Sequence, residues 1–154
     1  MGKQRVIDAY RGKKTDKVPW VPYVGVHGAF LLGERADRYL QDADLLARGV
    51  LHSARRYKAE GIPLCFDLQV EAMAMGCEAR WWEDNPPAIT VHPLAEKSLK
   101  MAELKVPTAS DGRWPVLVEA GRKVKAEIGD VALLGLLCGP ITLGAHLRGV
   151  KLFT

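Results

Sequence analysis

The stretch GIPLCFDLQVEAMAMG, residues 61–76, decides the fold of this chain. It opens with a short apolar run that ends abruptly at Asp67, and helix-favouring residues follow up to Gly76. An apolar run of this length between chain-breaking residues is typical of a β-strand buried on both faces. Asp67 is therefore expected at the carboxyl end of a parallel strand, the edge at which β/α proteins build active sites. A simple helix N-cap, with the carboxylate accepting backbone N–H bonds, explains Asp67 equally well.

A helix is predicted directly before this strand, over residues 43–60. Asp42 is a suitable N-cap for it, and Gly61 is expected at the C′ position. Apolar side chains recur at three- and four-residue spacing, which gives the helix one core-facing stripe. The stripe consists of Leu46, Val50, Ala54 and Tyr57.

Another strand is predicted before that helix, over residues 18–26. Pro19 and Pro22 cannot donate to a strand ladder, so they are expected at its entrance. His27 and Gly28 follow at its exit, where a glycine lets a ligand approach the backbone. A lone histidine at such a place is more often a loop residue than a ligand. Strand, helix and strand in this order predict a right-handed βαβ unit.

Five further elements are predicted from shorter patterns. Residues 3–11 predict a short amphipathic helix, and residues 78–91 predict two short strands around a proline-rich turn. Residues 95–104 are expected to be helical. Pro115 at a first helical position opens a helix that is predicted to run to residue 128.

The apolar run VALLGLLC, residues 131–138, predicts a third buried parallel strand. Gly139 and Pro140 then turn the chain into a last helix over residues 141–148. Free N–H groups at a helix start carry partial positive charge and can hold an anion. A plain strand-to-helix turn is the alternative interpretation of the same residues.

Length and composition indicate one soluble globular domain, residues 1–154. The net charge of +4 is modest, and the basic residues form no stripe of the kind that follows a phosphate backbone, so nucleic-acid binding is not expected. The three cysteines form no CxxC pair and lie in apolar surroundings, which is typical of reduced thiols in a cytoplasmic protein. No secretory signal is recognisable, and the longest apolar run is too short to span a membrane. No GxGxxG or GxxxxGK[ST] motif follows a predicted strand, which argues against a Rossmann-like nucleotide binder.

Three segments together resemble the uroporphyrinogen decarboxylase superfamily, which includes the cobamide-dependent methyltransferases that act on coenzyme M. They are FDLQVEAMAMGCE (66–78), DGRWPVLVEAGRKVKAEIGD (111–130) and LLGLLCGPITLGAHLRG (133–149). The resemblance extends over residues 6–149 and implies a (β/α)8 TIM barrel with its active site at the carboxyl ends of the strands. A full barrel needs about 250 residues, so the chain is expected to form an α/β partial barrel, the N-terminal half, with parallel strands and crossover helices.

Two branches of the superfamily differ at positions that can be compared. In the decarboxylases the first strand leads into an arginine-rich motif that holds the substrate carboxylates, and His27 and Leu31 stand here where arginines would be. Asp67 matches the aspartate that contacts the pyrrole N–H groups, and His146 replaces a tyrosine. Without those cations a porphyrinogen with its many carboxylates would be held poorly. The resemblance therefore favours methyl transfer from a methylcorrinoid to a thiol, with a decarboxylase-like lyase of porphyrin biosynthesis as the alternative.

The resemblance also implies site residues, cofactors and partners. Asp67 is expected to be catalytic by orienting a small-molecule or tetrapyrrole substrate. Residues expected to bind that substrate are His27, Gly28, Glu71, Gly139, Thr142 and His146. The zinc ligands of the methyltransferases come from the later half, so no metal or other cofactor is expected on this chain, while methylcorrinoid (a cobalamin-type cofactor) and zinc are implied for a full-length relative. A half barrel has open sheet edges and an exposed apolar face, which favour a homo-oligomer such as a dimer, or pairing with the missing C-terminal half. A non-catalytic subunit or fragment that self-associates is therefore a further hypothesis.

Overall fold

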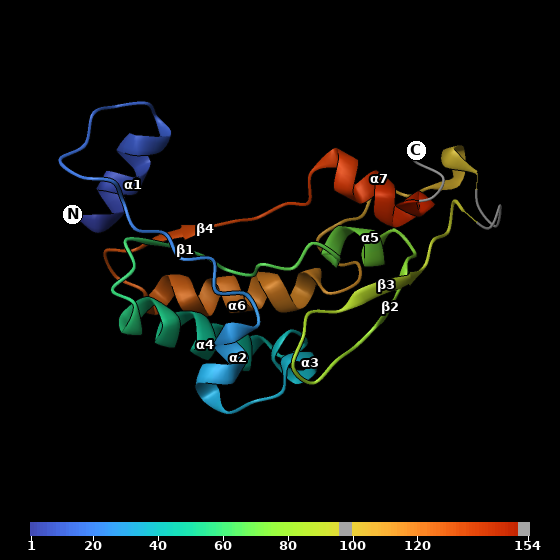
Figure 1. Cartoon of the computed structure of the whole chain (residues 1–154), viewed down its shortest axis with the longest axis horizontal. Helices are drawn as coiled ribbons and strands as arrows, with labels where there is room; N and C mark the ends of the chain where they lie inside the picture. Colours follow the sequence, from blue (N-terminus) through green and yellow to red (C-terminus); the bar gives the residue numbers. More distant parts are fainter. Residues whose placement is uncertain (96–99, 151–154) are drawn as a thin grey trace.

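Two short parallel strands lie at the centre of the computed structural model, which describes residues 1–95 and 100–150. Strand β1 (Gly61–Pro63) pairs with β4 (Ala132–Leu134), with Gly61 opposite Ala132. Helices α4 (Ala43–Arg56) and α6 (Trp114–Glu127) lie side by side along one face of this pair (Figure 1). The parallel pairing and the crossover helices confirm the α/β character expected from the sequence.

The predicted strand over residues 18–26 is wrong. The segment is extended chain that ends in a turn at Gly25 and Val26, and its contact with β1 is limited. The Trp20 carbonyl accepts hydrogen bonds from the N–H groups of Glu60 (2.9 Å) and Gly61 (3.3 Å). The prolines at positions 19 and 22 have no N–H to donate, so a regular ladder does not continue. The apolar runs beginning at residues 61 and 131 are also strands over three residues only.

Helix α4 begins where the sequence predicts. The Asp42 side chain accepts hydrogen bonds from the N–H groups of Asp44 (2.8 Å) and Leu45 (3.0 Å), as expected of an N-cap. The helix ends at Arg56, earlier than residue 60, and Lys58 takes the left-handed conformation with a φ of 49°. The predicted C′ position for Gly61 is therefore wrong, because Gly61 already belongs to β1.

The remaining elements surround this centre (Figure 1). Strands β2 (Glu78–Arg80) and β3 (Ala88–Val91) form an antiparallel pair, which confirms the prediction for residues 78–91. The helix predicted over residues 95–104 falls partly outside the described residues, and its described end is a 3₁₀ turn, η1 (Met101–Glu103). The other helices are α1 (Gly2–Tyr10), α2 (His27–Leu32), α3 (Ala36–Tyr39), α5 (Val70–Ala74) and α7 (Pro140–Arg148). Within residues 1–95 and 100–150, no helix combines the length and apolar character needed to cross a lipid bilayer.

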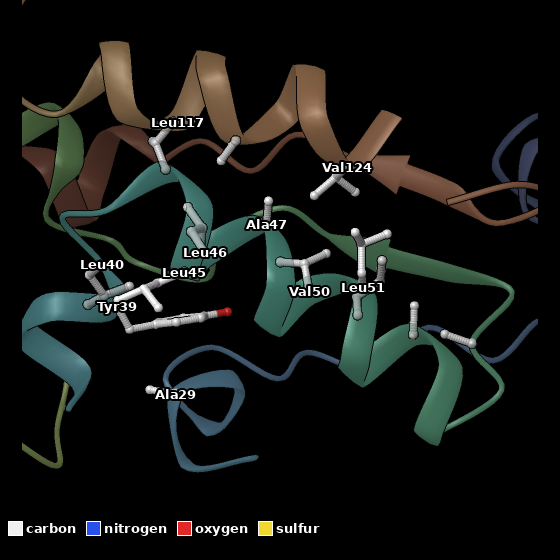
Figure 2. Packing of buried hydrophobic residues seen from close by; sticks show 14 of the residues in the cluster. Ala29, Tyr39, Leu40, Leu45, Leu46, Ala47, Val50, Leu51, Leu117 and Val124 are labelled. Atoms are coloured by element: carbon white, nitrogen blue, oxygen red, sulfur yellow. The ribbon is translucent and has the colours of Figure 1, made fainter. Parts of the chain in front are cut away.

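The main core fills the space between α4, α6 and the strands. Leu46 and Val50 of the predicted stripe are almost completely buried, as is Val124 on α6 (Figure 2). Tyr57, the last residue of that stripe, lies beyond the end of α4 and is only partly buried. Burial of a Leu or Val side chain stabilises the folded chain by about 1.5–3 kcal/mol. The Tyr39 ring lies between α4 and the helix that carries Ala29, and it closes the end of this core (Figure 2).

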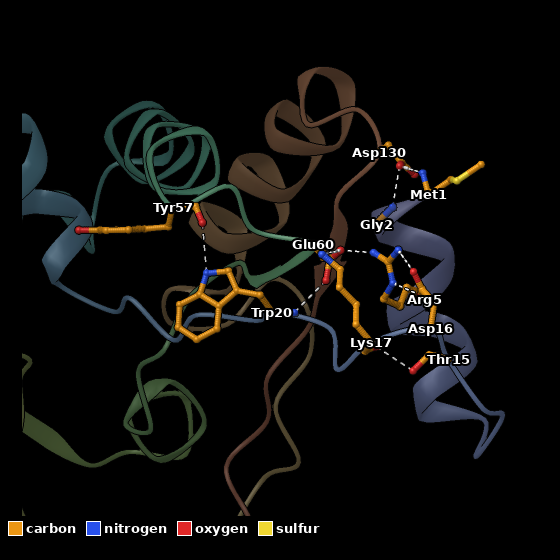
Figure 3. A network of polar contacts seen from close by, with 10 residues as sticks. All are labelled: Met1, Gly2, Arg5, Thr15, Asp16, Lys17, Trp20, Tyr57, Glu60 and Asp130. Atoms are coloured by element: carbon orange, nitrogen blue, oxygen red, sulfur yellow. Dashed lines mark hydrogen bonds and ion pairs between the residues drawn. The ribbon is translucent and has the colours of Figure 1, made fainter.

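A polar network attaches α1 to the amino ends of the strands (Figure 3). Glu60 accepts a hydrogen bond from the Trp20 N–H at 3.0 Å and forms ion pairs with Arg5 and Lys17. Arg5 also holds Asp16, with its Nε 2.6 Å from Oδ1. The network therefore fixes the helix and the following connector to the residue directly before β1.

Acid is expected to weaken this network. Hydrogen bonding by the Trp20 N–H holds the pKa of Glu60 below its ordinary value of 4.5, and hydrogen bonding to Arg5 lowers the pKa of Asp16 to about 2. Because both pKa values fall on folding, the stabilisation is fully present above about pH 4.5 and is lost as the pH falls towards about 2. Thermal midpoints followed by circular dichroism should therefore drop across this range.

Glu60→Gln should reduce that drop. Glu78→Gln is the matched control, because Glu78 is exposed and forms no ion pair with any described residue. An acid-induced drop of the same size in Glu60→Gln as in the unchanged chain would show that the network does not respond to acid in this way.

Candidate functional site

The chain segments that leave β1 and β4 lie next to each other. The first leads through Asp67 into α5, and the second leads through Gly139 into α7. Helices α5 and α7 are in contact (Figure 1). Glu71 on α5 links the two segments, because its Oε1 accepts a hydrogen bond from the Cys138 N–H at 2.9 Å. The carboxyl ends of both strands therefore meet in one place, as the candidate site requires.

Asp67 is buried beside this junction rather than exposed to solvent. Its side chain has no exposed surface, and both carboxylate oxygens have partners. Oδ1 accepts a hydrogen bond from the Gln69 N–H at 2.9 Å, and Oδ2 lies 2.5 Å from Nη2 of Arg113. Because β1 ends at Pro63 and the N-cap of α5 is Gln69, Asp67 lies in the connection that follows the strand, and the helix N-cap interpretation is wrong. Its expected role toward a substrate stays a prediction.

Arg113 is the residue that sequence reasoning missed. It lies directly before α6, is only 8% exposed, and bridges three parts of the chain. Besides Asp67, its Nη1 donates to the Leu40 carbonyl at 3.1 Å, and its guanidinium carbon lies 4.9 Å from the centre of the Trp81 ring. Its Nε is buried without a hydrogen-bond partner among the described residues. Asp67 is far away in sequence, so no local pattern indicates this pair.

Helix α7 carries three of the predicted substrate-binding residues: Gly139, Thr142 and His146. Gly139 is its N-cap, and a Cβ at this position would meet open space. Burial lowers the pKa of His146 and the neighbouring His92 lowers it further, while the carboxylate of Asp67 acts in the opposite direction. The Nε2 of His146 is buried without a hydrogen-bond partner among the described residues. His146 therefore offers an uncharged imidazole at neutral pH.

The predicted residues His27 and Gly28 lie elsewhere, at the start of α2. His27 Nε2 is 2.6 Å from the Tyr57 hydroxyl oxygen, and its ring stacks on Phe30. Gly28 is buried, and a Cβ there would lie 2.3 Å from the Tyr39 hydroxyl oxygen. Close packing against Tyr39 thus explains this glycine without a ligand. The substrate contacts predicted for both residues are not tested by these packing contacts.

The surroundings of the cysteines near the site raise the pKa of their thiols. Burial and, to a lesser extent, the nearby carboxylate of Asp67 raise the pKa of the Cys65 thiol to about 12. Burial likewise raises the pKa of Cys138, and Glu71 acts in the same direction. Thiols in this state are neutral at physiological pH and are poor nucleophiles. Among the residues that the structure describes, no three His, Cys, Asp or Glu side chains are grouped to hold a metal ion.

Comparison with known proteins gives a consistent result. A model of the family described as "Uroporphyrinogen decarboxylase (URO-D)" matches residues 1–153. Two curated relatives, methylcobamide:CoM methyltransferases MtaA from Methanosarcina barkeri and from its strain Fusaro, are 30% and 31% identical to the chain. Each match covers 98% of this chain and 46% of the relative.

A solved structure agrees with these matches. A methyltransferase from Methanosarcina mazei superimposes with a TM-score of 0.86 at 29% identity, over 97% of this chain and 46% of that one. The chain thus spans just under half the length of the relatives that it matches. The superposition confirms the predicted fold class, a partial (β/α)8 barrel.

Proposed function

The chain belongs to the uroporphyrinogen decarboxylase (URO-D) family, and on this basis we propose that it forms one half of an active site for methyl transfer from a methylcorrinoid to a thiol. The observation that carries the proposal is the 30% identity to methylcobamide:CoM methyltransferases over almost the whole chain. In the proposed reaction the cobalt–carbon bond breaks, its electron pair stays with the cobalt, and a carbon–sulfur bond forms as the thiol loses its proton.

The start of α2 supports methyl transfer over porphyrinogen decarboxylation. Its sequence, HGAFLL, contains neither arginine nor lysine. A porphyrinogen carries many carboxylates, and arginine is the side chain that pairs with a carboxylate through two parallel hydrogen bonds. The helix that stands in place of the arginine-rich motif of the decarboxylases therefore offers no such partner for the carboxylates of a porphyrinogen.

The junction of α5 and α7 supplies groups that suit a small anionic thiol. Free N–H groups in the first turn of α7, between Gly139 and Thr142, are donors for a negatively charged substrate group. Glu71 keeps this turn in place through its bond to the Cys138 N–H. Asp67 and Arg113 hold the neighbouring segment rigid, since neither side chain is free to reorient. In this proposal His146 lies beside the substrate, and its buried Nε2, which has no hydrogen-bond partner among the described residues, forms one hydrogen bond with it.

The residues of this chain do not by themselves fit the zinc ion that the family resemblance implies. Zinc needs three or four grouped nitrogen, sulfur or carboxylate ligands, and the described residues contain no such group. In this proposal, activation of the thiol substrate depends on residues beyond those of this chain.

A second candidate, a half-barrel subunit that acts by association, is favoured by the exposed apolar residues of the open barrel. Tyr23 and Phe66 meet edge to face with ring centres 5.5 Å apart, yet they remain 52% and 42% exposed. Leu137 and Ile141, on the other strand exit, are 75% and 72% exposed. Such residues gain free energy when a complementary surface covers them. Both candidates require a second polypeptide that covers these exposed apolar residues.

One assay tests both candidates. The chain is mixed with a separately produced C-terminal half of the Methanosarcina barkeri methyltransferase, and methylcobalamin and coenzyme M are added. We expect demethylation of the corrinoid, followed by its absorbance, only when both halves are present, and a mixed complex by light scattering. Turnover by the chain alone would contradict the half-site proposal. A stable mixed complex without turnover would favour the association candidate, and release of CO₂ from uroporphyrinogen would favour the decarboxylase alternative.

A further inference from the structure

A hollow on the outer surface, away from the candidate site, runs between α4 and α6. It has a volume of about 920 Å³, and its lining residues come from α2, α4 and α6. Its apolar floor consists of Ala47 and Leu51, which belong to the main core and are only 4% and 6% exposed, and of the partly buried Leu32 and the exposed Ala126. The outer helices of a barrel normally present a convex, solvated surface. A large hollow with an apolar floor therefore differs from the surface expected of helices that contact only water.

The rim of this groove is positively charged. Arg48, His52 and Arg55 follow one another at four- and three-residue spacing and so share one side of α4, with Arg56 beside them. Across the groove, α6 contributes Lys123. The two acidic residues of the lining are Asp44 and Glu127, one near the start of α4 and one at the end of α6. Four cations against two carboxylates leave a net positive rim, even with the histidine neutral.

Much of this charge is not neutralised within the chain. Arg48 and Arg56 form no ion pair with any described residue, and both are exposed. The pair between Arg55 and Glu127 is loose, with 3.7 Å between its atoms and both side chains more than 60% exposed. Only Lys123 is firmly held, 2.5 Å from Asp44. The α4 side of the groove thus presents cations that are available to an external partner.

We propose that this groove docks an acidic amphipathic helix of a partner protein. Arg48 and Arg55 are seven residues apart, about 10.5 Å along a helix axis, which matches carboxylates at positions i and i+7 of a helix laid along the groove. The apolar floor accepts the leucine-type side chains of such a helix. A nucleic acid fits less well, since it has no apolar side chains for the floor, and Asp44 and Glu127 would repel a continuous phosphate backbone.

The test uses a fluorescent synthetic peptide with Glu at i, i+4 and i+7 and Leu along the adjoining face. Its anisotropy is measured with the full chain at low and high salt. We expect binding that weakens as salt rises, and a loss of at least about tenfold in affinity for the double variant Arg48→Glu/Arg55→Glu, because like charges would then face each other. The matched control Lys3→Glu/Arg11→Glu makes the same change of net charge on exposed positions of α1 and its end, and it should bind as the unchanged chain does.

Several outcomes would overturn the proposal. These are absence of peptide binding, equal affinity for a scrambled peptide of the same composition, or equal weakening by the control variant. Tighter binding of a single-stranded oligonucleotide or of anionic vesicles of matched charge would assign the groove to another class of partner. Thermal midpoints of both variants serve as a folding check, and they are expected to stay close to that of the unchanged chain because all four positions are exposed.

Discussion

Replacement of Arg113 by alanine is expected to lower the free energy of unfolding by about 3–5 kcal/mol. The substitution leaves the Asp67 carboxylate in a site with no exposed surface and no cation to balance its charge. It also removes the donor to the Leu40 carbonyl and the contact with the Trp81 ring. Urea denaturation followed by circular dichroism measures the effect. The expected decrease in the free energy of unfolding is large because the Asp67 carboxylate stays buried without a partner. The net contribution of the intact ion pair to stability is smaller than this.

Arg35→Ala is the matched control. Arg35 is paired with Asp37 at 2.6 Å, but half of its side chain is exposed, so its loss should cost no more than about 1 kcal/mol. The double variant Asp67→Ala/Arg113→Ala should lose less than the sum of the two single variants, because neither buried charge is then left alone. Equal costs for Arg113→Ala and Arg35→Ala would show that the buried pair has no special weight.

Gly49→Ala is expected to destabilise the chain by about 1–3 kcal/mol, although alanine is the better helix former. In an ordinary helix interior this substitution stabilises by up to about 1 kcal/mol. Gly49 lies inside α4, where a Cβ would come within 2.4 Å of the Tyr39 ring and 2.8 Å of its hydroxyl oxygen. The ring lies in a closed space between α2 and α4, so either the ring or a helix must move (Figure 2). Chemical denaturation again provides the measurement.

Gly135→Ala is a suitable control, since a Cβ at that position meets nothing within 4 Å. Combination of Gly49→Ala with Tyr39→Leu should reduce the cost of the glycine substitution, because the smaller side chain frees the space that the methyl group needs. A gain in stability on Gly49→Ala would mean that Tyr39 moves aside easily and that the close packing is not a constraint.

Features that depend on neighbouring residues could be predicted from the sequence. The Asp42 cap places the start of α4, and proline in the first turn places the start of α6 and of α7. The proline-rich turn between β2 and β3 carries its own local signal. Each of these signals acts within a few residues of the element that it defines, so no tertiary information is needed.

Features that depend on distant residues could not be predicted in this way. Arg113 and Asp67 are 46 residues apart in the sequence, with α5 and the β2–β3 pair between them. The close packing of Gly28 against Tyr39 could not be predicted either, because Tyr39 belongs to another helix. The segment at residues 18–26 has a strand-like composition, but its two prolines remove donors that a ladder requires. The sequence therefore predicted that Asp67 follows a central strand, but it did not predict Arg113, the cation that pairs with Asp67.

The pairing of β1 with β4 has a consequence for synthesis of the chain on the ribosome. Gly61 finds its partner only at Ala132, after α5, the β2–β3 pair and α6 have been made. Ribosomes add about 5–20 residues per second, so the apolar β1 segment waits for several seconds before its partner strand emerges. During that interval α4 can form by local contacts, whereas the sheet cannot. A nascent chain whose synthesis stops before β4 would expose Ile62 and the apolar side of α4. Chaperones bind such apolar surfaces, and aggregation begins at them.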